Sequence, residues 1–214
     1  MDTISNRTAG NEPTFPLLTV ARLRMGTDGE GVTALVAGAG CPLRCRWCLN
    51  KRILREGKAT PVDARELYER VRQDDLYFRA TGGGVTFGGG ESLLHAAFLR
   101  RFREVCPGEW RIAAETSLAV DSELVRLSLG AVDHYIVDCK DMDDDIYRRY
   151  TGGDAELMRG NLRLLLDAAG PERVTVRVPL IPEYNTPEDQ ARSAERLRRM
   201  GVQKLDLFSY EIRE

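Results

Sequence analysis

The sequence of 214 residues lacks the features that would place it outside the ordinary globular class. No apolar run reaches about 18 residues, so no membrane span is expected. The N-terminal stretch MDTISNRTAGNEPTFP has no apolar core, which argues against a secretory signal and predicts a cytoplasmic protein. A net charge of −2 gives no general attraction for nucleic acid. With neither repeats nor low-complexity tracts, the length fits one domain.

Cysteine and histidine are also scarce, at five and two residues, yet three of the cysteines stand together in the stretch CPLRCRWC. Cys41, Cys45 and Cys48 follow the spacing C-x3-C-x2-C, and three thiols this close cannot all pair as disulfides. They can converge on one soft metal centre, and thiolate ligands suit iron–sulfur clusters. A four-iron cubane on three protein ligands keeps one iron open for a small molecule.

A zinc site or three unrelated thiols is the alternative to a cluster. Zinc takes four ligands, and the remaining candidates are all distant in the sequence: Cys106, Cys139, His95 and His134. A cluster is therefore the favoured interpretation. Because a cluster with an open iron is sensitive to oxygen, it also indicates an anaerobic setting and a reducing compartment.

Strand and helix patterns alternate along the rest of the chain. Strands are expected at residues 17–25, 32–38, 84–87, 110–116, 132–140, 174–180 and 204–210, and helices at 61–79, 92–104, 121–129, between 141 and 168, and at 187–200. Such alternation predicts parallel strands with helical crossovers. Six units are too few for a closed eight-fold barrel. We therefore expect an α/β fold, a partial (β/α)6 barrel over residues 17–214, preceded by a flexible N-terminal arm at residues 1–16.

In such barrels the chemistry lies at the carboxyl ends of the strands, and several polar residues of this sequence fall there. The glycine-rich stretch GGGVTFGGGES (82–92) can bring a ligand against the backbone, and Glu91 can pair with an ammonium group. Lys140 can hold a carboxylate, Asp138 can bind a cation or hydroxyl groups, and the fork of Arg177 fits a carboxylate. Taken singly, the glycines could form only a tight turn before a helix, and the charged residues could form ordinary surface ion pairs. Together they supply what an amino acid ligand needs.

Four longer stretches carry a family resemblance. They are DGEGVTALVAGAGCPLRCRWC from Asp28 to Cys48, GGGVTFGGGE ending at Glu91, the strand end Asp138-Cys139-Lys140, and RVPLIPEYN at residues 177–185. With these motifs the chain resembles one branch of the radical S-adenosylmethionine (SAM) superfamily, the activating enzymes of glycyl radical enzymes, of the pyruvate formate-lyase activase type.

The resemblance implies a [4Fe–4S] cluster on Cys41, Cys45 and Cys48, with SAM bound at the open iron. One-electron reduction of SAM would break its C5′–S bond and leave methionine and a 5′-deoxyadenosyl radical. In this family the radical removes a hydrogen atom from a glycine of a partner enzyme. The cofactor supplies the difficult chemistry, and the protein contributes placement and the exclusion of water.

The same resemblance assigns roles around SAM to further residues. Those implied to contact SAM are Trp47 beside the adenine, Gly89, Gly90 and Glu91 at the ammonium group, and Lys140 and Arg177 at the carboxylate or ribose side. Those matching a site for a monovalent cation, Na⁺ or K⁺, beside SAM are Glu115, Thr116 and Asp138. Asp28 is implied to lie on the substrate side.

The implied partners are a glycyl radical enzyme and a one-electron donor such as flavodoxin or ferredoxin, with no part for nucleic acid or a membrane. Departures from the family pattern are Leu49 for a frequent His, Glu30 and Thr33 for Pro and Arg, Gly88 for Ser, and Ser209-Tyr210-Glu211 for Pro-Tyr-His before an end at Glu214 without the usual tail. Several of them lie near the expected substrate side. A radical SAM enzyme acting on a peptide or small molecule is therefore an alternative, and a non-catalytic iron–sulfur or zinc protein is another.

Overall fold

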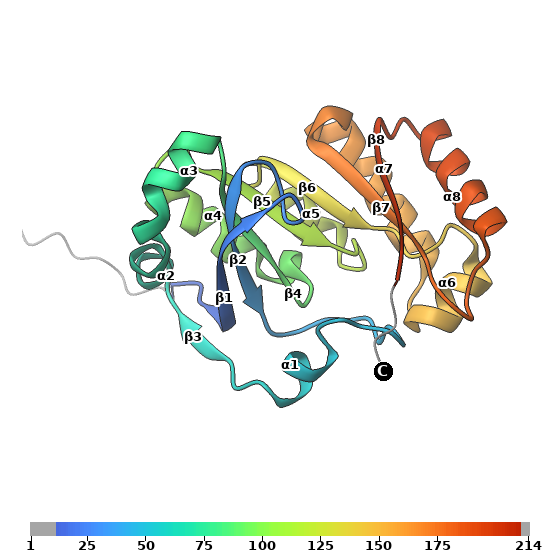
Figure 1. Cartoon of the computed structure of the whole chain (residues 1–214), viewed down its shortest axis with the longest axis horizontal. Coiled ribbons are helices and arrows are strands. Elements are labelled where there is room, and N and C mark those ends of the chain that lie inside the picture. The colour runs from blue at the N-terminus through green and yellow to red at the C-terminus, as the bar shows by residue number, and fades with distance from the viewer. Residues whose placement is uncertain (1–11, 211–214) are drawn as a thin grey trace, which may run out of the picture.

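An eight-stranded sheet forms the centre of the computed structural model, which describes residues 12–210 (Figure 1). The strand order is β3-β1-β2-β4-β5-β6-β7-β8. The strands are β1 (Phe15–Met25), β2 (Val32–Gly38), β3 (Thr60–Val62), β4 (Gly84–Gly89), β5 (Arg111–Thr116), β6 (His134–Asp138), β7 (Val174–Leu180) and β8 (Lys204–Ser209). Since β3 and β8 end this order and do not pair with each other, the barrel is open.

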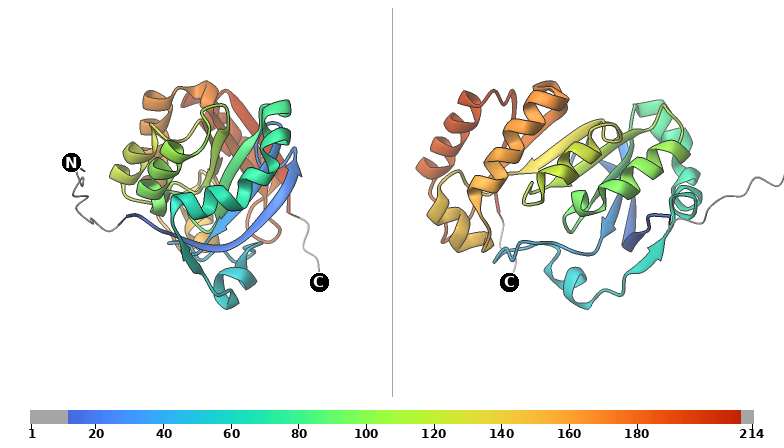
Figure 2. Two further views of the ribbon diagram at one scale, coloured as in Figure 1. Left: turned by 90° about the vertical axis from the view of Figure 1, so that its left-hand side faces the viewer. Right: turned by 180° about the vertical axis from the view of Figure 1, so that it is seen from behind.

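Six consecutive strands of the sheet, β2 and β4 to β8, run parallel. The helices are α1 (Lys51–Glu56), α2 (Ala64–Val71), α3 (Asp75–Thr81), α4 (Ala96–Val105), α5 (Ser122–Ser128), α6 (Asp144–Thr151), α7 (Ala155–Ala169) and α8 (Pro187–Arg199). In Figure 1, α4 and α5 lie behind the strands, and from behind they lie in front with α7 and α8 (Figure 2). This arrangement confirms the predicted partial (β/α)6 barrel.

An aromatic cluster joins the start of β1, the strand β4 and the helix α4. The Phe15 ring lies 5.5 Å from that of Phe87 and 5.2 Å from that of Phe98, and the Phe87 ring lies 5.4 Å from that of Phe102. All four side chains are almost fully buried. Because edge-to-face aromatic pairs have a defined geometry, this packing fixes where β4 ends and thus where its glycines lie.

The first strand begins earlier than the sequence predicts. Phe15 and Pro16 belong to β1 and pair with Val62 and Pro61 of β3, so the arm expected over residues 1–16 ends too late by two residues. Packing explains the earlier start, since the Phe15 side chain is fully buried. Pro13 and Pro16 on either side of Phe15 hide this strand start in the sequence. Residues 1–11 of the expected arm lie outside the described residues.

The single helix predicted over residues 61–79 is wrong. Residues 60–62 form β3, which pairs antiparallel with β1, and α2 begins after Asp63. Asp63 and Glu66 form a capping box, with the Glu66 amide 2.8 Å from the Asp63 carboxylate. A 3₁₀ turn at residues 72–74 then separates α2 from α3.

The short helix α1 follows the cysteines and is not predicted by the sequence. It has no buried residue, so it lacks the apolar periodicity by which helices are recognised. Among residues 12–210, no helix is both long enough and apolar enough to cross a membrane.

Candidate functional site

One cavity of about 550 Å³ opens at the carboxyl ends of the parallel strands. Its lining includes all of the residues that the sequence singles out except Trp47: Asp28, Cys41, Cys45, Cys48, Gly89, Gly90, Glu91, Glu115, Thr116, Asp138, Lys140 and Arg177. These residues come from six separate segments of the chain. The alternation of strands and helices therefore brings them together, because parallel strands present their carboxyl ends at one rim.

The cysteine loop is held to the end of α6 by two backbone hydrogen bonds. The Arg44 and Arg46 amides donate to the carbonyls of Thr151 and Tyr150, at 2.8 and 3.1 Å, at the end of α6. Leu43 is buried beneath the loop. The loop is thus a fixed part of the barrel rim, and its three cysteines line the cavity.

His95 fastens the strand that leads into this loop. Its Nε2 lies 3.1 Å from the Ala39 carbonyl oxygen, two residues before Cys41, and its ring packs edge-on against Phe15 with centroids 5.0 Å apart. Since a carbonyl only accepts, Nε2 carries the proton. Burial lowers the pKa of His95, so the neutral ring is the favoured form. Sequence patterns do not reveal this contact, because 56 residues separate its partners.

The glycines at the end of β4 press against the backbone that precedes the cysteines. The Gly90 amide donates to Gly38 at 3.0 Å, and the Glu91 amide donates to Gly40 at 2.8 Å. A Cβ at Gly90 would lie 2.1 Å from the Gly40 oxygen, and Gly89 has a φ of +87°. Only glycine allows both the approach and the positive φ. The glycines therefore position the cysteine loop, whatever ligand the cavity takes.

Glu91 is buried and its carboxylate accepts four hydrogen bonds. Oε1 accepts from the Thr116 hydroxyl at 2.6 Å and the Leu93 amide at 3.1 Å, and Oε2 from the Ser117 amide at 2.8 Å and hydroxyl at 2.6 Å. Burial raises the pKa of Glu91, and the donors of Ser117 and Thr116 oppose that rise. A carboxylate offers about four acceptor positions, so this side chain is saturated by the protein. Ser117 belongs to no sequence motif that would identify it as a partner of Glu91.

Lys140 and Asp138 form a partly buried pair that also lines the cavity. The Lys140 ammonium lies 3.0 Å from the Asp138 carboxylate and 3.1 Å from the Tyr210 hydroxyl. Burial disfavours the charge of Lys140, yet Asp138 and Tyr210 raise its pKa well above the usual value. Cys139, between them, is fully buried in the core, as strand alternation predicts. Lys140 is thus a fixed cation facing the cavity.

Arg177 ties β7 to β5 and to the turn between β1 and β2. Its guanidinium lies 2.8 Å from the Glu115 carboxylate, donates to the Thr27 carbonyl, and lies 3.7 Å from Asp206. Burial raises the pKa of Glu115, Arg177 lowers it, and nearby Asp138 raises it further. The turn also carries Asp28, whose buried carboxylate pairs with Arg24.

The thiols fit a cluster better than a single ion. Among the described residues, no group of three His, Cys, Asp or Glu side chains is arranged to hold one metal ion, and the cavity lining contains no histidine and no fourth cysteine. A zinc site needs four such ligands around one atom. A four-iron cubane spans a larger volume and accepts three thiolates spread over one wall, so the donor set favours it.

Trp47 does not line the cavity, although the sequence places it in the cofactor site. Its indole nitrogen is buried without a hydrogen-bond partner among the described residues. The Tyr150 hydroxyl is likewise buried and unpartnered there, and Tyr150 does line the cavity. Tyr150 therefore contributes its side chain to the cavity wall, while its hydroxyl is buried.

Comparison with known proteins places the chain among radical SAM proteins. The description "Radical SAM superfamily" matches residues 35–197. The pyruvate formate-lyase 2-activating enzyme of Escherichia coli is 30% identical over 199 residues, covering 78% of this chain and 67% of that protein. The (2S)-3-sulfopropanediol dehydratase activating enzyme of Klebsiella oxytoca is 28% identical, covering 74% and 69%.

Solved structures agree at the level of the fold. The crystal structure of SuiB from Streptococcus suis matches 84% of this chain and 40% of its own, with a TM-score of 0.63 and 11% identity. TYW1 matches 84% of this chain and 65% of its own, with a TM-score of 0.56 and 16% identity. At these identities the likeness concerns the barrel alone.

Proposed function

Because the chain belongs to the radical SAM superfamily, we propose that it is the activating enzyme of a glycyl radical enzyme. The superfamily implies a [4Fe–4S] cluster and SAM. When bound, they supply the reductive cleavage of the C5′–S bond of SAM, which yields methionine and the 5′-deoxyadenosyl radical. In our proposal the hydrogen atom removed by this radical comes from a glycine of the partner enzyme.

The observation that carries the proposal is the single cavity. Cys41, Cys45 and Cys48 line this cavity, and the fixed cation Lys140 lines it as well. We assign the cluster to the three cysteines and the carboxylate of the methionine portion to Lys140. Arg177 lies on the same rim and is assigned to the carboxylate or ribose side.

The ammonium group of SAM is assigned to the glycine segment. In this assignment the backbone carbonyls of Gly89 and Gly90 act directly, because the Glu91 carboxylate is already saturated by Thr116 and Ser117. Glu91 then acts by holding the ends of β4 and β5 together. Trp47 keeps its proposed place beside the adenine only if its side chain turns toward the cavity.

Two further assignments concern a cation and the substrate side. Glu115 and Asp138 stand on adjacent strands close enough for the charge of Asp138 to raise the pKa of Glu115, and with Thr116 they would hold Na⁺ or K⁺. Asp28, in the turn between β1 and β2, lines the cavity and is assigned to the substrate side.

The support for a protein substrate comes from the relatives. The curated relatives named above are activating enzymes of a pyruvate formate-lyase and of a sulfopropanediol dehydratase. A one-electron donor such as flavodoxin or ferredoxin completes the proposal, because the cleavage of SAM consumes one electron per turnover.

The experiment that tests this function is electron paramagnetic resonance of the partner. The reconstituted protein, SAM and a reductant are incubated without oxygen with purified pyruvate formate-lyase and, separately, with (2S)-3-sulfopropanediol dehydratase. A glycyl doublet that needs SAM and is absent with Cys45→Ala supports the proposal. Formation of 5′-deoxyadenosine with neither doublet would contradict activation of these enzymes and favour a peptide or small-molecule substrate.

A further inference from the structure

We propose that residues 44–58, here called the basic segment, form the docking surface for an acidic one-electron donor protein. The proposal rests on the proposed function, since only a radical SAM enzyme needs that electron. The basic segment carries six cations, Arg44, Arg46, Lys51, Arg52, Arg55 and Lys58, and one anion, Glu56. Its net charge is thus +5 in a chain whose net charge is −2.

These charges are available to a partner. All six cationic side chains are exposed. Among residues 12–210 the basic segment makes one ion pair, Arg52 with Glu56 at 3.8 Å, and the side chains of that pair are 92% and 72% exposed. Many arginines elsewhere pair with carboxylates, as Arg22 does with Asp74 and Arg79 with Asp75. The positive potential here is therefore not cancelled within the described chain.

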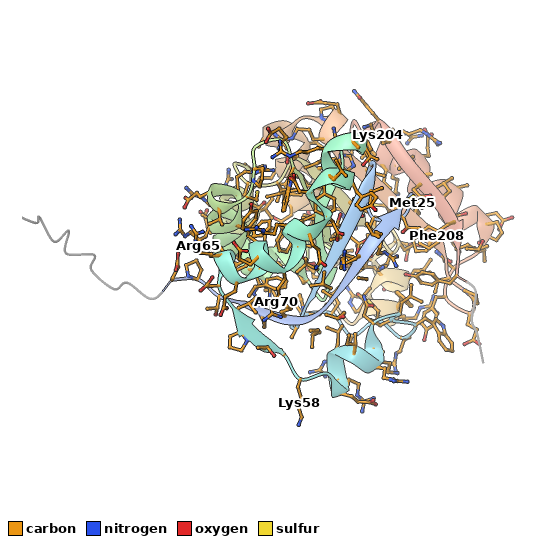
Figure 3. All side chains as sticks on the ribbon, turned by 60° about the vertical axis from the view of Figure 1, so that its left-hand side comes forward. Met25, Lys58, Arg65, Arg70, Lys204 and Phe208 are labelled. Carbon is orange, nitrogen blue, oxygen red and sulfur yellow. The ribbon has the colours of Figure 1, made fainter. Side chains whose placement is uncertain are left out.

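The fold gives these cations no packing role. The helix α1, which carries three of them, has no buried residue. In Figure 1 it lies below the sheet, apart from the helices that cover the strands, and Figure 3 shows Lys58 pointing away from the molecule beyond the end of α1. A charged helix that contributes nothing to the core is explained by a partner on its outer side.

The position beside the thiols selects an electron donor. Arg44 and Arg46 stand between the cysteines, and Leu49, directly after Cys48, is 83% exposed. Electron transfer weakens steeply with distance, so a donor must dock on the face nearest the cluster. Leu49 lines the cavity and stands in the sequence between Arg46 and Lys51. An exposed apolar side chain flanked by cations fits an acidic rim around an apolar redox group.

The electron balance of the docking step is simple. One electron passes from the donor to the cluster, whose formal charge falls by one. In a flavin donor the anionic hydroquinone becomes the neutral semiquinone. No bond forms or breaks, and no proton is exchanged.

Nucleic acid is the competing polyanion, and the residues argue against it. Single strands are held by aromatic side chains on which bases stack, and the only aromatic residue of the basic segment is Trp47, whose indole nitrogen is buried. The net charge of the chain also repels a long polyanion beyond the patch.

The test reverses three charges that follow the cysteines, two on α1 and one shortly after it, in a variant here called the α1 variant. The variant Lys51→Glu/Arg55→Glu/Lys58→Glu is compared with Arg65→Glu/Arg70→Glu/Arg198→Glu, which reverses three exposed arginines on α2 and α8 that make no ion pair among the described residues. Binding of a purified acidic flavodoxin is measured by biolayer interferometry at 50 and 500 mM NaCl. Binding of a labelled single-stranded RNA is measured beside it.

We expect the α1 variant to lose about tenfold or more in the association rate with flavodoxin at 50 mM NaCl, and the difference to shrink at 500 mM. The control variant keeps wild-type binding. Equal binding by all three proteins, an equal loss in both variants, or RNA binding that depends on α1 and exceeds that of flavodoxin would overturn the proposal.

A second readout separates docking from catalysis. The rate of cluster reduction is followed by stopped-flow absorbance, with flavodoxin hydroquinone and with photoreduced deazaflavin, a small neutral reductant. The α1 variant should be slow with flavodoxin and normal with deazaflavin. Slowness with both reductants would overturn the docking role. If no protein forms 5′-deoxyadenosine with deazaflavin, even with the partner enzymes tested above, the proposed function is refuted, whereas the binding comparison still decides the docking role.

Discussion

At the scale of single residues, the site is governed by saturated hydrogen bonding around a buried carboxylate. Every partner of Glu91 is a donor: the Leu93 and Ser117 amides and the Thr116 and Ser117 hydroxyls. A group of this kind stabilises the fold only while all its partners stay satisfied. Glu91 is thus a structural residue of the rim even before a ligand binds.

Glu91→Gln should therefore destabilise the protein in the absence of SAM. Its amide NH₂ would face donors that it cannot accept from, and the free energy of unfolding should fall by about 1–3 kcal/mol. Urea denaturation measures the change. The control is Glu123→Gln, whose side chain is 80% exposed and which should change stability by less than about 0.5 kcal/mol. Equal stability of both variants would show that the Glu91 carboxylate is free for a ligand.

The histidine that holds the cysteine loop gives a pH-dependent effect. Burial lowers the pKa of folded His95 below its ordinary value of 6.5, so in that range the unfolded chain binds this proton more strongly than the folded chain. The stabilisation by neutral His95 is complete above about pH 6.5 and is lost as the pH falls through the lower folded pKa.

The stability difference between the wild type and His95→Gln should therefore shrink between pH 7.5 and pH 5.5. Urea denaturation at each pH gives the difference, in which the titrations shared by both proteins cancel. A difference that stays constant or grows on acidification would contradict the neutral, buried role of His95.

At the scale of elements, the ends of β2 and β4 are fitted together through glycine. Gly38 pairs with Gly89 in the parallel register, and the two amides that follow donate back to β2 and to Gly40. The cysteine loop starts from this joint, so its position depends on a contact between backbones.

Gly90→Ala should disrupt that joint, because the new Cβ would lie 2.1 Å from the Gly40 oxygen. We expect a loss of about 1–3 kcal/mol in stability and a lower iron content after reconstitution. The control is Gly160→Ala in α7, where a Cβ meets nothing within 4 Å and should stabilise the helix by up to about 1 kcal/mol. If Gly90→Ala keeps wild-type stability and iron content, the backbone contact between β2 and β4 does not position the cysteine loop.

Sequence reasoning was reliable where the pattern is regular. The six parallel strands follow from apolar runs separated by helical periodicity, and the rule that chemistry lies at their carboxyl ends brought Lys140 and the cysteines into one cavity. It failed at β3, because Pro61 before a helical pattern resembles a helix start, although residues 60–62 pair with β1.

The remaining misses concern contacts that only the folded chain creates. Ser117 binds Glu91 from 26 residues away, and His95 binds Ala39 from 56 residues away. Neither position carries a local pattern. The helix α1 was missed for the opposite reason, since it buries no residue and its sequence has no apolar face to detect.

At the scale of the whole molecule, Arg177 links the two halves of the open barrel. It lies on β7, pairs with Glu115 on β5, and donates to Thr27 in the turn between β1 and β2. The Arg177 and Glu115 side chains are only 18% and 19% exposed, so solvent screens this pair less than a surface pair. Removing one partner leaves the other charge without compensation.

A double-mutant cycle should show this coupling. Arg177→Met should cost about 2–4 kcal/mol, and Arg177→Met/Glu115→Gln should cost less than the sum of the single changes. The matched surface pair Arg199 and Glu195, with side chains 74% and 53% exposed, should couple by no more than about 1 kcal/mol. If the losses in unfolding free energy from the two single changes simply add in the double variant, the Arg177–Glu115 pair does not stabilise the barrel.

The account as a whole depends on radical chemistry at the three cysteines. The decisive measurement is the amount of 5′-deoxyadenosine formed without oxygen by the reconstituted protein with SAM and photoreduced deazaflavin, beside Cys45→Ala. The account predicts 5′-deoxyadenosine and methionine in equal amounts from the wild type and none from the variant. A wild-type protein that takes up no iron, or that loads a four-iron cluster and binds SAM yet never cleaves it with any partner tested above, would contradict it.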